Sequence, residues 1–348
     1  MGSNIGVFVG SASSFNIIRA AENIGQALSE EFSVHLVSTK KSFAEEVSHS
    51  YEQYHGTTEN SSTLGEISAL RSYIESWKPD ALFQITEPPI HGTIVGCFAA
   101  VYDIPFVYRY SGDRFYEYRD SLGFDKIVHF GLNNVLGRTP LVLAEACVAL
   151  GPTGNSRLVR RGVPEENIRI IPPIVNKGQF SPDGSCIRFD TDRHVGLFVG
   201  RLSRRKGKEI IERNLPKILD RRSDLQFVFI GEQTDHFTVP PHCGDNITFV
   251  GSVPPEEVPK YYRASSFMIH PSLSEGVPRA VLEANAAGVP TIARDVGDVG
   301  YVTDNTFTTE SEFVNLVCDF ESLQPNSVDR FTADRVKPDY ARLFHKII

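Results

Sequence analysis

The strongest constraint on the fold is a regular alternation of short apolar runs with longer amphipathic stretches. Ile5–Gly10 is typical of a buried strand, and Ser14–Leu28 is typical of a helix packed on one face. The same pattern resumes with an apolar run at His194–Val199 and an amphipathic stretch at Lys208–Arg222. Strands that alternate with helices of this length indicate βαβ units and parallel sheets covered on both faces.

The alternation is interrupted once, by a stretch rich in proline, glycine and polar residues between Pro172 and Arg193. The chain of 348 residues is also longer than one typical domain. We therefore expect an N-terminal Rossmann-like domain over residues 1–175, a linker over 176–193, a second Rossmann-like domain over 194–330 and a C-terminal helix over 331–348. Ligands of such sheets bind beyond the carboxyl ends of the strands, so a cleft between the domains is predicted.

Composition excludes several classes of protein. The formal net charge of −8 argues against a nucleic-acid partner, since such proteins usually carry a strongly basic domain. Five scattered cysteines without a CxxC pair predict reduced thiols, no metal site and a cytoplasmic location. The first residues lack a cationic segment followed by a long apolar run, so no signal peptide is expected. No run approaches the roughly 20 apolar residues that span a bilayer.

One group of candidate functional residues lies in the segment VGRLSRRKGK, Val199–Lys208, between an apolar run and a helical pattern. Gly200 permits a tight turn, and Arg201 and Lys206 would then lie at the sheet edge beside the amides that begin the helix. Two fixed cations in such a loop can neutralise the charge of a departing diphosphate. A solvated basic turn, or a basic patch for nucleic acid, is the alternative for this segment alone.

A second group lies in SLSEGVPRAVLEANAAGVP, Ser272–Pro290. Pro278 suits the first position of a helix, which places Glu275 in the preceding loop and Glu283 inside the helix. A loop glutamate can accept hydrogen bonds from sugar hydroxyls, and a helical glutamate can accept them from a ribose. Taken alone, Glu275 is equally well explained as a partner of the helix dipole, and Glu283 as a solvated helix residue.

Together, the two groups resemble the motifs of glycosyltransferase family 4, in this order and about seventy residues apart. The matching residues are Gly200-Arg201-Leu202, Lys206-Gly207, Glu275-Gly276, Pro278, Glu283-Ala284, Ala286, Gly288 and Pro290. The resemblance implies the GT-B fold, in which two doubly wound Rossmann-like domains face each other across a cleft. It also implies that the C-terminal helix returns to the N-terminal domain.

The resemblance further implies transfer of a sugar from a nucleotide-diphosphate donor, with retention at the anomeric carbon and without a metal. The donor is a substrate, so no cofactor is expected. Arg201 and Lys206 would contact its diphosphate, Glu283 its ribose, and Glu275 and Gly276 the transferred sugar. The full set of expected donor contacts is Gly10, Ser11, Gly200, Arg201, Lys206, Gly251, Ser252, Val253, Glu275, Gly276, Val277 and Glu283. The triplet Asp190-Thr191-Asp192 lies in the expected linker and is interpreted as a chance D-x-D match.

The N-terminal half departs from the family pattern. Gly10 and Ser11 stand where paired glycines are common, and a simple strand-to-helix turn explains them equally well. Many relatives have a histidine near the position of Ser111, and Asp113 is the nearest group that could orient or deprotonate an acceptor hydroxyl, with Arg109 close in sequence. The expected catalytic residues are therefore Asp113, Glu275, Arg201 and Lys206, and His91 is a weaker candidate.

The acceptor is expected to be a glycan or a lipid-linked sugar. Ile127–Gly162 mixes apolar residues with four arginines and one acid, Glu145, which suits peripheral contact with the inner face of a membrane. A buried helix with an arginine-bearing surface fits the same residues. Two other functions stay open: a non-catalytic nucleotide-sugar-binding partner subunit, and an epimerase or phosphorylase on the same architecture.

Overall fold

The computed structural model describes residues 2–10, 15–39, 47–56, 62–86, 88–111, 115, 118, 123–238 and 240–348. The chain forms two compact units. Unit 1 comprises residues 1–174 together with 333–348, and unit 2 comprises residues 175–332. Residues 176–193, where the linker is expected, contain no helix or strand and are grouped with unit 2.

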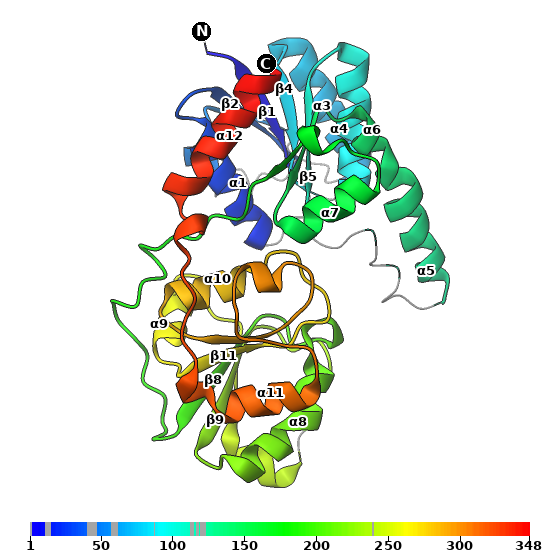
Figure 1. The fold of residues 1–348 in the computed structure, drawn as a ribbon. Coiled ribbons are helices and arrows are strands. Elements are labelled where there is room, and N and C mark those ends of the chain that lie inside the picture. Colours follow the sequence, from blue (N-terminus) through cyan, green and yellow to red (C-terminus); the bar gives the residue numbers. More distant parts are fainter. Residues whose placement is uncertain are drawn as a thin grey trace. The chain divides into compact units, whose positions relative to one another are not determined.

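Unit 1 is built on a parallel seven-stranded sheet with the order β3-β2-β1-β4-β5-β6-β7 (Figure 1). Its strands are β1 (Asn4–Phe8), β2 (Ser33–Val37), β3 (Gln53–His55), β4 (Ala81–Gln84), β5 (Phe106–Tyr110), β6 (Ala146–Ala149) and β7 (Ile168–Ile170). The central strands β4, β5 and β6 are buried along their whole length, as expected for a parallel sheet covered on both faces.

The helices of unit 1 cover both faces of this sheet. They are α1 (Phe15–Leu28), α3 (Thr63–Trp77), α4 (Pro88–Tyr102), α5 (Gly123–Phe130), α6 (Thr139–Leu143), α7 (Pro152–Arg160) and α12 (Ala333–Ile347). One core cluster joins α1 and α12 to one face of the sheet, and a second joins α3, α4 and α7 to the other face. Side chains alternate between the clusters, so that Val7 lies in the first and Phe8 in the second.

The C-terminal helix α12 belongs to unit 1, as the family resemblance implies, and lies beside α1 (Figure 1). Its apolar residues Val336, Tyr340, Leu343 and Phe344 recur at helical spacing and are all buried in the first core cluster. The ring of Phe344 packs edge-on against Phe83 of β4, at 5.6 Å between ring centroids.

Unit 2 repeats the architecture with a parallel six-stranded sheet of order β10-β9-β8-β11-β12-β13. Its strands are β8 (His194–Val199), β9 (Leu225–Ile230), β10 (Ile247–Gly251), β11 (Phe267–His270), β12 (Thr291–Arg294) and β13 (Thr306–Phe307), and its helices are α8 (Lys208–Arg221), α9 (Val258–Arg263), α10 (Arg279–Ala286) and α11 (Glu310–Cys318). The apolar faces of α8 and α11 form one core with the sheet. The two units therefore have the predicted doubly wound α/β architecture.

Truncating the buried ring at position 344 tests the packing of α12 on unit 1. Phe344→Ala should lower the free energy of unfolding of unit 1 by roughly 3–5 kcal/mol, because the substitution leaves a cavity in a closed core. Urea titration read by hydrogen-exchange mass spectrometry reports each unit separately. Ile348→Ala, at a half-exposed site after the same helix, should change the free energy of unfolding of unit 1 by less than about 1 kcal/mol. Equal effects of the two changes would contradict this packing.

Candidate functional site

The candidate site of unit 2 lies where the direction of winding of its sheet reverses. The chain passes from β8 outward through β9 to β10, then returns to β11 on the other side of β8 and continues outward. The loops that leave the carboxyl ends of β8 and β11 therefore diverge to opposite faces of the sheet. This topological switch point is where doubly wound sheets bind ligands.

The loop after β8 contains two backbone positions that favour glycine. Gly200 has φ 137° and Gly207 has φ 83°, values that favour glycine. A Cβ at position 207 would lie 2.1 Å from the carbonyl oxygen of Pro271, in the loop after β11. A hydrogen bond of 2.8 Å from the Leu273 amide to the Arg205 carbonyl joins the same two loops. The backbone thus brings the two sequence motifs together.

Two predicted site residues meet at this junction. Lys206 Nζ donates a hydrogen bond of 2.5 Å to Glu275 Oε1, and His270 Nε2 lies 3.0 Å from the same oxygen. His270 is the last residue of β11 and is almost fully buried, with Ser272 Oγ 3.3 Å from its Nε2. The carboxylate of Glu275 is thereby fixed between an ammonium group and an imidazole.

The electrostatics of this cluster favour an ionised Glu275. Burial alone would raise the pKa of the carboxyl group, but the hydrogen bond from His270 and the nearby charges of His270 and Lys206 outweigh that effect. The pKa of Glu275 is consequently held well below its usual range. The loop presents a fixed carboxylate beside a cation.

The loop after β12 closes over Glu275 and Gly276. Gly297 has φ 60°, and a Cβ there would lie 2.0 Å from the carbonyl oxygen of Glu275. The amide of Asp298 donates a hydrogen bond of 3.3 Å to the Gly276 carbonyl. Val277, the next expected donor contact, is buried. Glycine is required at position 297 for this close approach between backbones.

The second predicted glutamate, Glu283, lies in α10. Its Oε2 is 3.5 Å from the hydroxyl of Tyr262, and its Oε1 is 3.9 Å from Nε of Arg279 one turn earlier. The pKa of Tyr262 is raised well above its ordinary value by burial and by the nearby carboxylate, so this hydroxyl stays protonated and can donate. Pro278 precedes the helix at the N-cap, one position earlier than expected.

The segment Gly251–Val253, which is expected to contact the donor, follows the edge strand β10. Gly251 has φ 82° with open space where a Cβ would lie, Ser252 is exposed and Val253 is half-buried. The Gly231 amide donates a hydrogen bond of 2.8 Å to the Gly251 carbonyl, and a Cβ at position 231 would lie 2.3 Å from the Gly200 carbonyl. The turns after β8, β9 and β10 are therefore packed backbone to backbone.

Arg201 follows Gly200 directly and is exposed. Within the part of the chain that the structure describes, its guanidinium makes no ion pair. Arg201 and Lys206 come from one loop, and the amides at the start of α8 follow them. An anion near this loop would meet both side-chain charge and the positive end of a helix dipole.

The corresponding switch point of unit 1 lies between β1 and β4 and contains a buried polar chain. The Gly10 amide donates to Thr86 Oγ1 over 2.7 Å, Thr86 Oγ1 lies 2.9 Å from His91 Nδ1, and His91 Nε2 lies 3.1 Å from Glu66 Oε2. Both ring nitrogens of His91 are thus engaged, and the ring is nearly inaccessible. His91 therefore holds the turn after β1 in place.

Gly10 also has a packing role. A Cβ at position 10 would lie 1.9 Å from Cε1 of His91, so only glycine fits against the ring. Ser11 and Asp113, the other candidates in this half, lie outside the described residues. Arg109 is buried beside Tyr340 of α12, where burial lowers the pKa of its guanidinium, and Ser111 is half-exposed. Arg109 therefore supports the core of unit 1.

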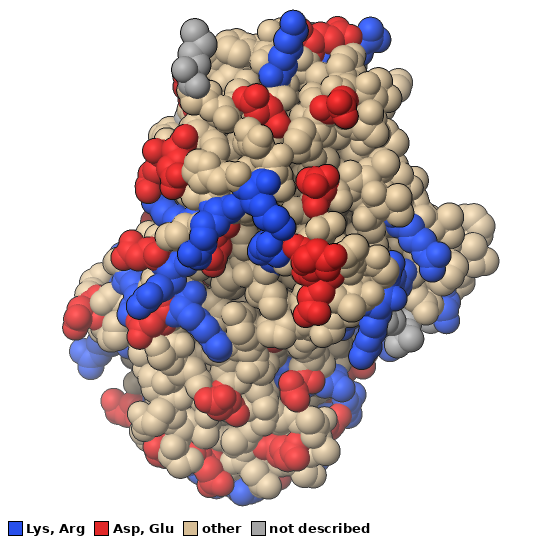
Figure 2. All heavy atoms as spheres, turned by 45° about the horizontal axis from the view of Figure 1, so that its top comes forward, with Lys and Arg blue, Asp and Glu red and all other residues tan. Residues whose placement is uncertain are grey.

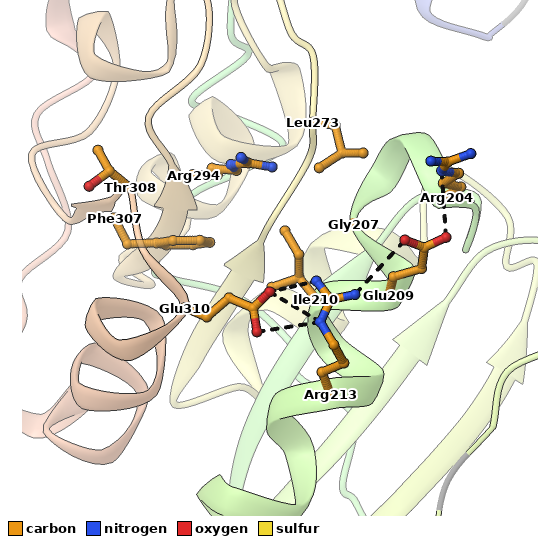
Figure 3. A pocket seen from close by; sticks show the side chains of 10 residues that line it. All are labelled: Arg204, Gly207, Glu209, Ile210, Arg213, Leu273, Arg294, Phe307, Thr308 and Glu310. Carbon is orange, nitrogen blue, oxygen red and sulfur yellow. Dashed lines mark hydrogen bonds and ion pairs between the residues drawn. The ribbon is translucent and has the colours of Figure 1, made fainter. Parts of the chain in front are cut away.

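A separate hollow of about 230 Å³ lies on the α8 and α11 side of unit 2 (Figure 3). Arg213 NH2 forms an ion pair of 2.5 Å with Glu310, and Arg204 Nε lies 3.5 Å from Glu209. Arg294 lies across the hollow from the Arg213–Glu310 pair (Figure 3). Gly207 and Leu273 of the loop junction line this hollow, but Lys206 and Glu275 do not.

Over the described ranges, no group of three or more His, Cys, Asp or Glu side chains is arranged to hold a metal ion. Asp190 and Asp192 are both exposed in an irregular segment.

Comparison with known proteins shows what unit 2 is similar to. Residues 193–319 match the family model described as glycosyl transferases group 1, a range that contains Lys206, Glu275 and Glu283. A D-inositol 3-phosphate glycosyltransferase of Segniliparus rotundus is 29% identical over 146 residues, which cover 38% of this chain and 32% of that protein.

A more extended relative is the GPI3 subunit of phosphatidylinositol N-acetylglucosaminyltransferase from Saccharomyces cerevisiae. It is 23% identical over 199 residues, which cover 55% of this chain and 44% of that subunit. The chain thus spans less than half the length of these curated relatives.

Solved structures match the chain over nearly its whole length. Sucrose-phosphate synthase from Thermosynechococcus elongatus superposes with a TM-score of 0.71 at 17% identity, covering 99% of this chain and 96% of that one. Anabaena HepE, solved with UDP-glucose, superposes with a TM-score of 0.68 at 13% identity. The match covers 99% of this chain and 95% of the HepE chain. These matches agree with the predicted GT-B fold.

The residues that support the site of unit 2 could not be predicted from the motifs. His270 is the clearest case, because it contacts Glu275 directly. A histidine at the carboxyl end of an otherwise apolar strand, five residues before a motif glutamate, was the available signal. Tyr262 and Arg279 carry no comparable signal, since aromatic and basic residues are ordinary in helices.

Glycine at position 207 should be essential to the junction of the two loops. Gly207→Ala is expected to destabilise unit 2 by about 3 kcal/mol or more, because it combines an unfavourable φ with a backbone clash. Gly251→Ala has a similar φ but open space, and should cost only about 1 kcal/mol. Urea unfolding measures the loss of stability in each variant. Equal losses in Gly207→Ala and Gly251→Ala would show that the contact with Pro271 is unimportant.

The low pKa of Glu275 predicts a pH-dependent contribution to stability. Its charged form is favoured in the folded state, so the contribution is complete above the unfolded pKa of about 4.3 and is lost as the pH falls further. The stability advantage of the wild type over Glu275→Gln should therefore be largest near neutral pH and shrink below about pH 4.3. Urea midpoints of both proteins over this range provide the measurement, and a gap independent of pH would contradict the assignment.

Proposed function

We propose that this chain is a retaining glycosyltransferase that moves a sugar from a nucleotide-diphosphate donor to a hydroxyl of a glycan or lipid-linked acceptor, without a metal. The contact between Lys206 and Glu275 at the switch point of unit 2 carries the proposal. In this contact an ammonium group, which would bind the diphosphate, lies next to a carboxylate, which would bind the sugar. The family of unit 2 supports the same reaction class.

The charges of the cluster suit cleavage of a sugar–diphosphate bond. Negative charge develops on the leaving diphosphate as the bond breaks, and the Arg201 and Lys206 side chains would stabilise it. Two fixed cations perform the task that a divalent ion performs in other transferases, which motivates the proposal of metal independence. Glu275 would accept hydrogen bonds from the transferred sugar, and Glu283 from the ribose. No resident cofactor takes part.

The leaving diphosphate would also receive the acceptor proton in a front-face reaction with retention. In this scheme the acceptor hydroxyl approaches on the side from which the diphosphate departs. Asp113 is proposed to orient that hydroxyl from unit 1, while His91 acts only by holding the Gly10 turn. Gly10 and Ser11 would lie beside the donor.

The names of relatives agree with a nucleotide-sugar donor. Several relatives are called glycosyltransferases or a glycosyltransferase subunit, and HepE was solved with UDP-glucose. We propose on this basis that a nucleoside diphosphate sugar is the natural partner of unit 2, with its base near Gly251, Ser252 and Val253.

A screen of nucleotide sugars tests the function. The full chain is incubated with UDP-, GDP- and ADP-sugars, with and without a mixture of sugar acceptors, and released nucleotide and products are read by mass spectrometry. A glycosyltransferase releases the nucleotide and transfers the sugar. A partner subunit would bind nucleotide and release none, and an epimerase would convert the donor sugar without any acceptor. Either of those outcomes would overturn the proposal.

Charge removal at the loop after β8 should abolish most turnover. Arg201→Ala and Lys206→Ala are each expected to lower kcat a hundredfold or more, because each removes a charge partner of the leaving group. Lys177→Ala removes an exposed ion pair with Asp329 elsewhere in unit 2 and should leave kcat unchanged. Steady-state release of nucleotide measures all three, and near-normal turnover in both site variants would exclude the donor-site assignment.

A further inference from the structure

The two carboxylate oxygens of Glu275 have different surroundings. Oε1 accepts a hydrogen bond of 2.5 Å from Lys206 Nζ and lies 3.0 Å from His270 Nε2. For Oε2, the described part of the chain supplies no hydrogen-bond donor, although the side chain of Glu275 is only 10% exposed. Each oxygen of an ionised carboxylate can accept two hydrogen bonds. The protein therefore holds one oxygen of this group and leaves the other available to a ligand.

The two partners of Oε1 differ in how firmly they are held. Lys206 has a flexible four-carbon side chain that is 25% exposed. His270 is 3% exposed at the end of β11, where its backbone pairs with Ala293 of β12. An anion near the loop after β8 would compete with Glu275 for the ammonium group of Lys206, but not for the buried imidazole. His270 is therefore the partner that keeps Glu275 in place once an anion is bound.

The chemistry of the contact fixes the direction of the hydrogen bond. The ionised carboxylate of Glu275 can only accept, so Nε2 of His270 carries the proton between them. Ser272 Oγ lies 3.3 Å from the same nitrogen and is also buried. The backbone of Glu275 is held separately, by the close approach of Gly297 in the loop after β12. With the backbone placed, the imidazole decides where the carboxylate points.

We propose that His270 is a positioning residue for donor selection, which holds Glu275 so that Oε2 accepts hydrogen bonds from hydroxyl groups of the transferred sugar. This inference rests on the proposed glycosyltransferase function and assigns the sugar to a class, the hexoses that present free hydroxyl groups to Oε2. A site built around a buried acceptor rejects an analogue that lacks the hydroxyl group, because the acceptor is then left unpaired. In this role His270 acts through Glu275 and not by contact with the sugar.

The surface of the chain does not by itself select a sugar. Acidic side chains lie among the basic ones over the face drawn in Figure 2, and none of the helices in the described ranges is long and apolar enough to cross a membrane. Hexoses that differ in the position of one hydroxyl group carry the same charge, so a field of one sign does not distinguish them. A fixed acceptor such as Glu275 Oε2 does.

Calorimetric titration of the full chain tests the inference. The ligands are UDP, GDP, ADP, UDP-glucose, GDP-glucose and ADP-glucose, so the contribution of the sugar is the ratio of two dissociation constants. His270→Leu nearly keeps the volume of the side chain but removes the donor, and should raise Kd for the nucleotide sugar about tenfold or more. Kd for the matching nucleoside diphosphate should be unchanged, since the diphosphate is expected to contact Arg201 and Lys206. His270→Gln should keep the wild-type ratio, because its amide nitrogen can reach the position of Nε2.

Further variants keep the test informative even if His270→Leu does not fold. His270→Asn carries the same amide as His270→Gln on a side chain one methylene group shorter, and should lose the contribution of the sugar. His270→Asn/Glu275→Gln should bind the nucleotide sugar no more weakly than Glu275→Gln alone, since both changes act on one contact. His194→Leu makes the same change as His270→Leu at an exposed site at the amino end of β8, and should leave both constants unchanged.

Four results would overturn the inference. They are a wild type that binds no nucleotide glucose more tightly than the matching nucleoside diphosphate, equal losses of affinity for both kinds of ligand in His270→Leu, a wild-type ratio in His270→Leu, and equal ratios in His270→Gln and His270→Asn. Any of them, obtained with a wild type that transfers sugar in the donor screen, leaves the proposed function intact. Absence of turnover in that screen would overturn the function itself.

Discussion

The ion pair between Lys206 and Glu275 connects the two loops on which the candidate site depends. One loop leaves β8 and the other leaves β11, and the two strands are neighbours at the switch point of the sheet. The close contact between Gly207 and Pro271 holds the backbones of the two loops together. His270 contacts the carboxylate of Glu275. The fold therefore positions the polar groups of this cluster. The buried end of β11 carries the imidazole of His270, and the turn at Gly207 positions the ammonium group of Lys206.

The two units use their switch points differently. In unit 2 the charged groups include an exposed Arg201 and a partly exposed Lys206, which suits contact with an anion. In unit 1 the corresponding place is filled by the hydrogen-bonded chain from Gly10 through Thr86 and His91 to Glu66, which is buried. The polar groups of that chain bond to one another, so the chain positions the turn after β1.

Much of the fold could be predicted from the sequence because its elements carry strong periodic patterns. The C-terminal helix expected over residues 331–348 is present as α12 (Ala333–Ile347), since its apolar residues recur at helical spacing. The edge strands β3 and β13 were not predicted, because three and two residues are too few to show a pattern. Helix α5 was not predicted as a separate element for another reason. Its apolar residues look like a buried run in the sequence, although none of its residues is buried in the structure.

The site was only partly predictable. The motif pair indicated that Lys206 and Glu275 belong to one site although 69 positions separate them, and the structure brings them into contact. The roles of His270 and His91 could not be predicted, because a histidine is defined by its neighbours in space. His91, considered as a weak catalytic candidate, has both ring nitrogens engaged in a buried chain. Asp113 and Ser11 remain predictions.

The most direct test of the central claim is a crystal structure of the full chain with a nucleoside diphosphate, with UDP, GDP and ADP tried in turn. The account predicts the diphosphate against Arg201 and Lys206, the ribose hydroxyls at Glu283 and the base beside Gly251–Val253. Density for the nucleotide in the hollow between Arg294 and the Arg213–Glu310 pair, or anywhere else away from Lys206 and Glu275, would contradict it.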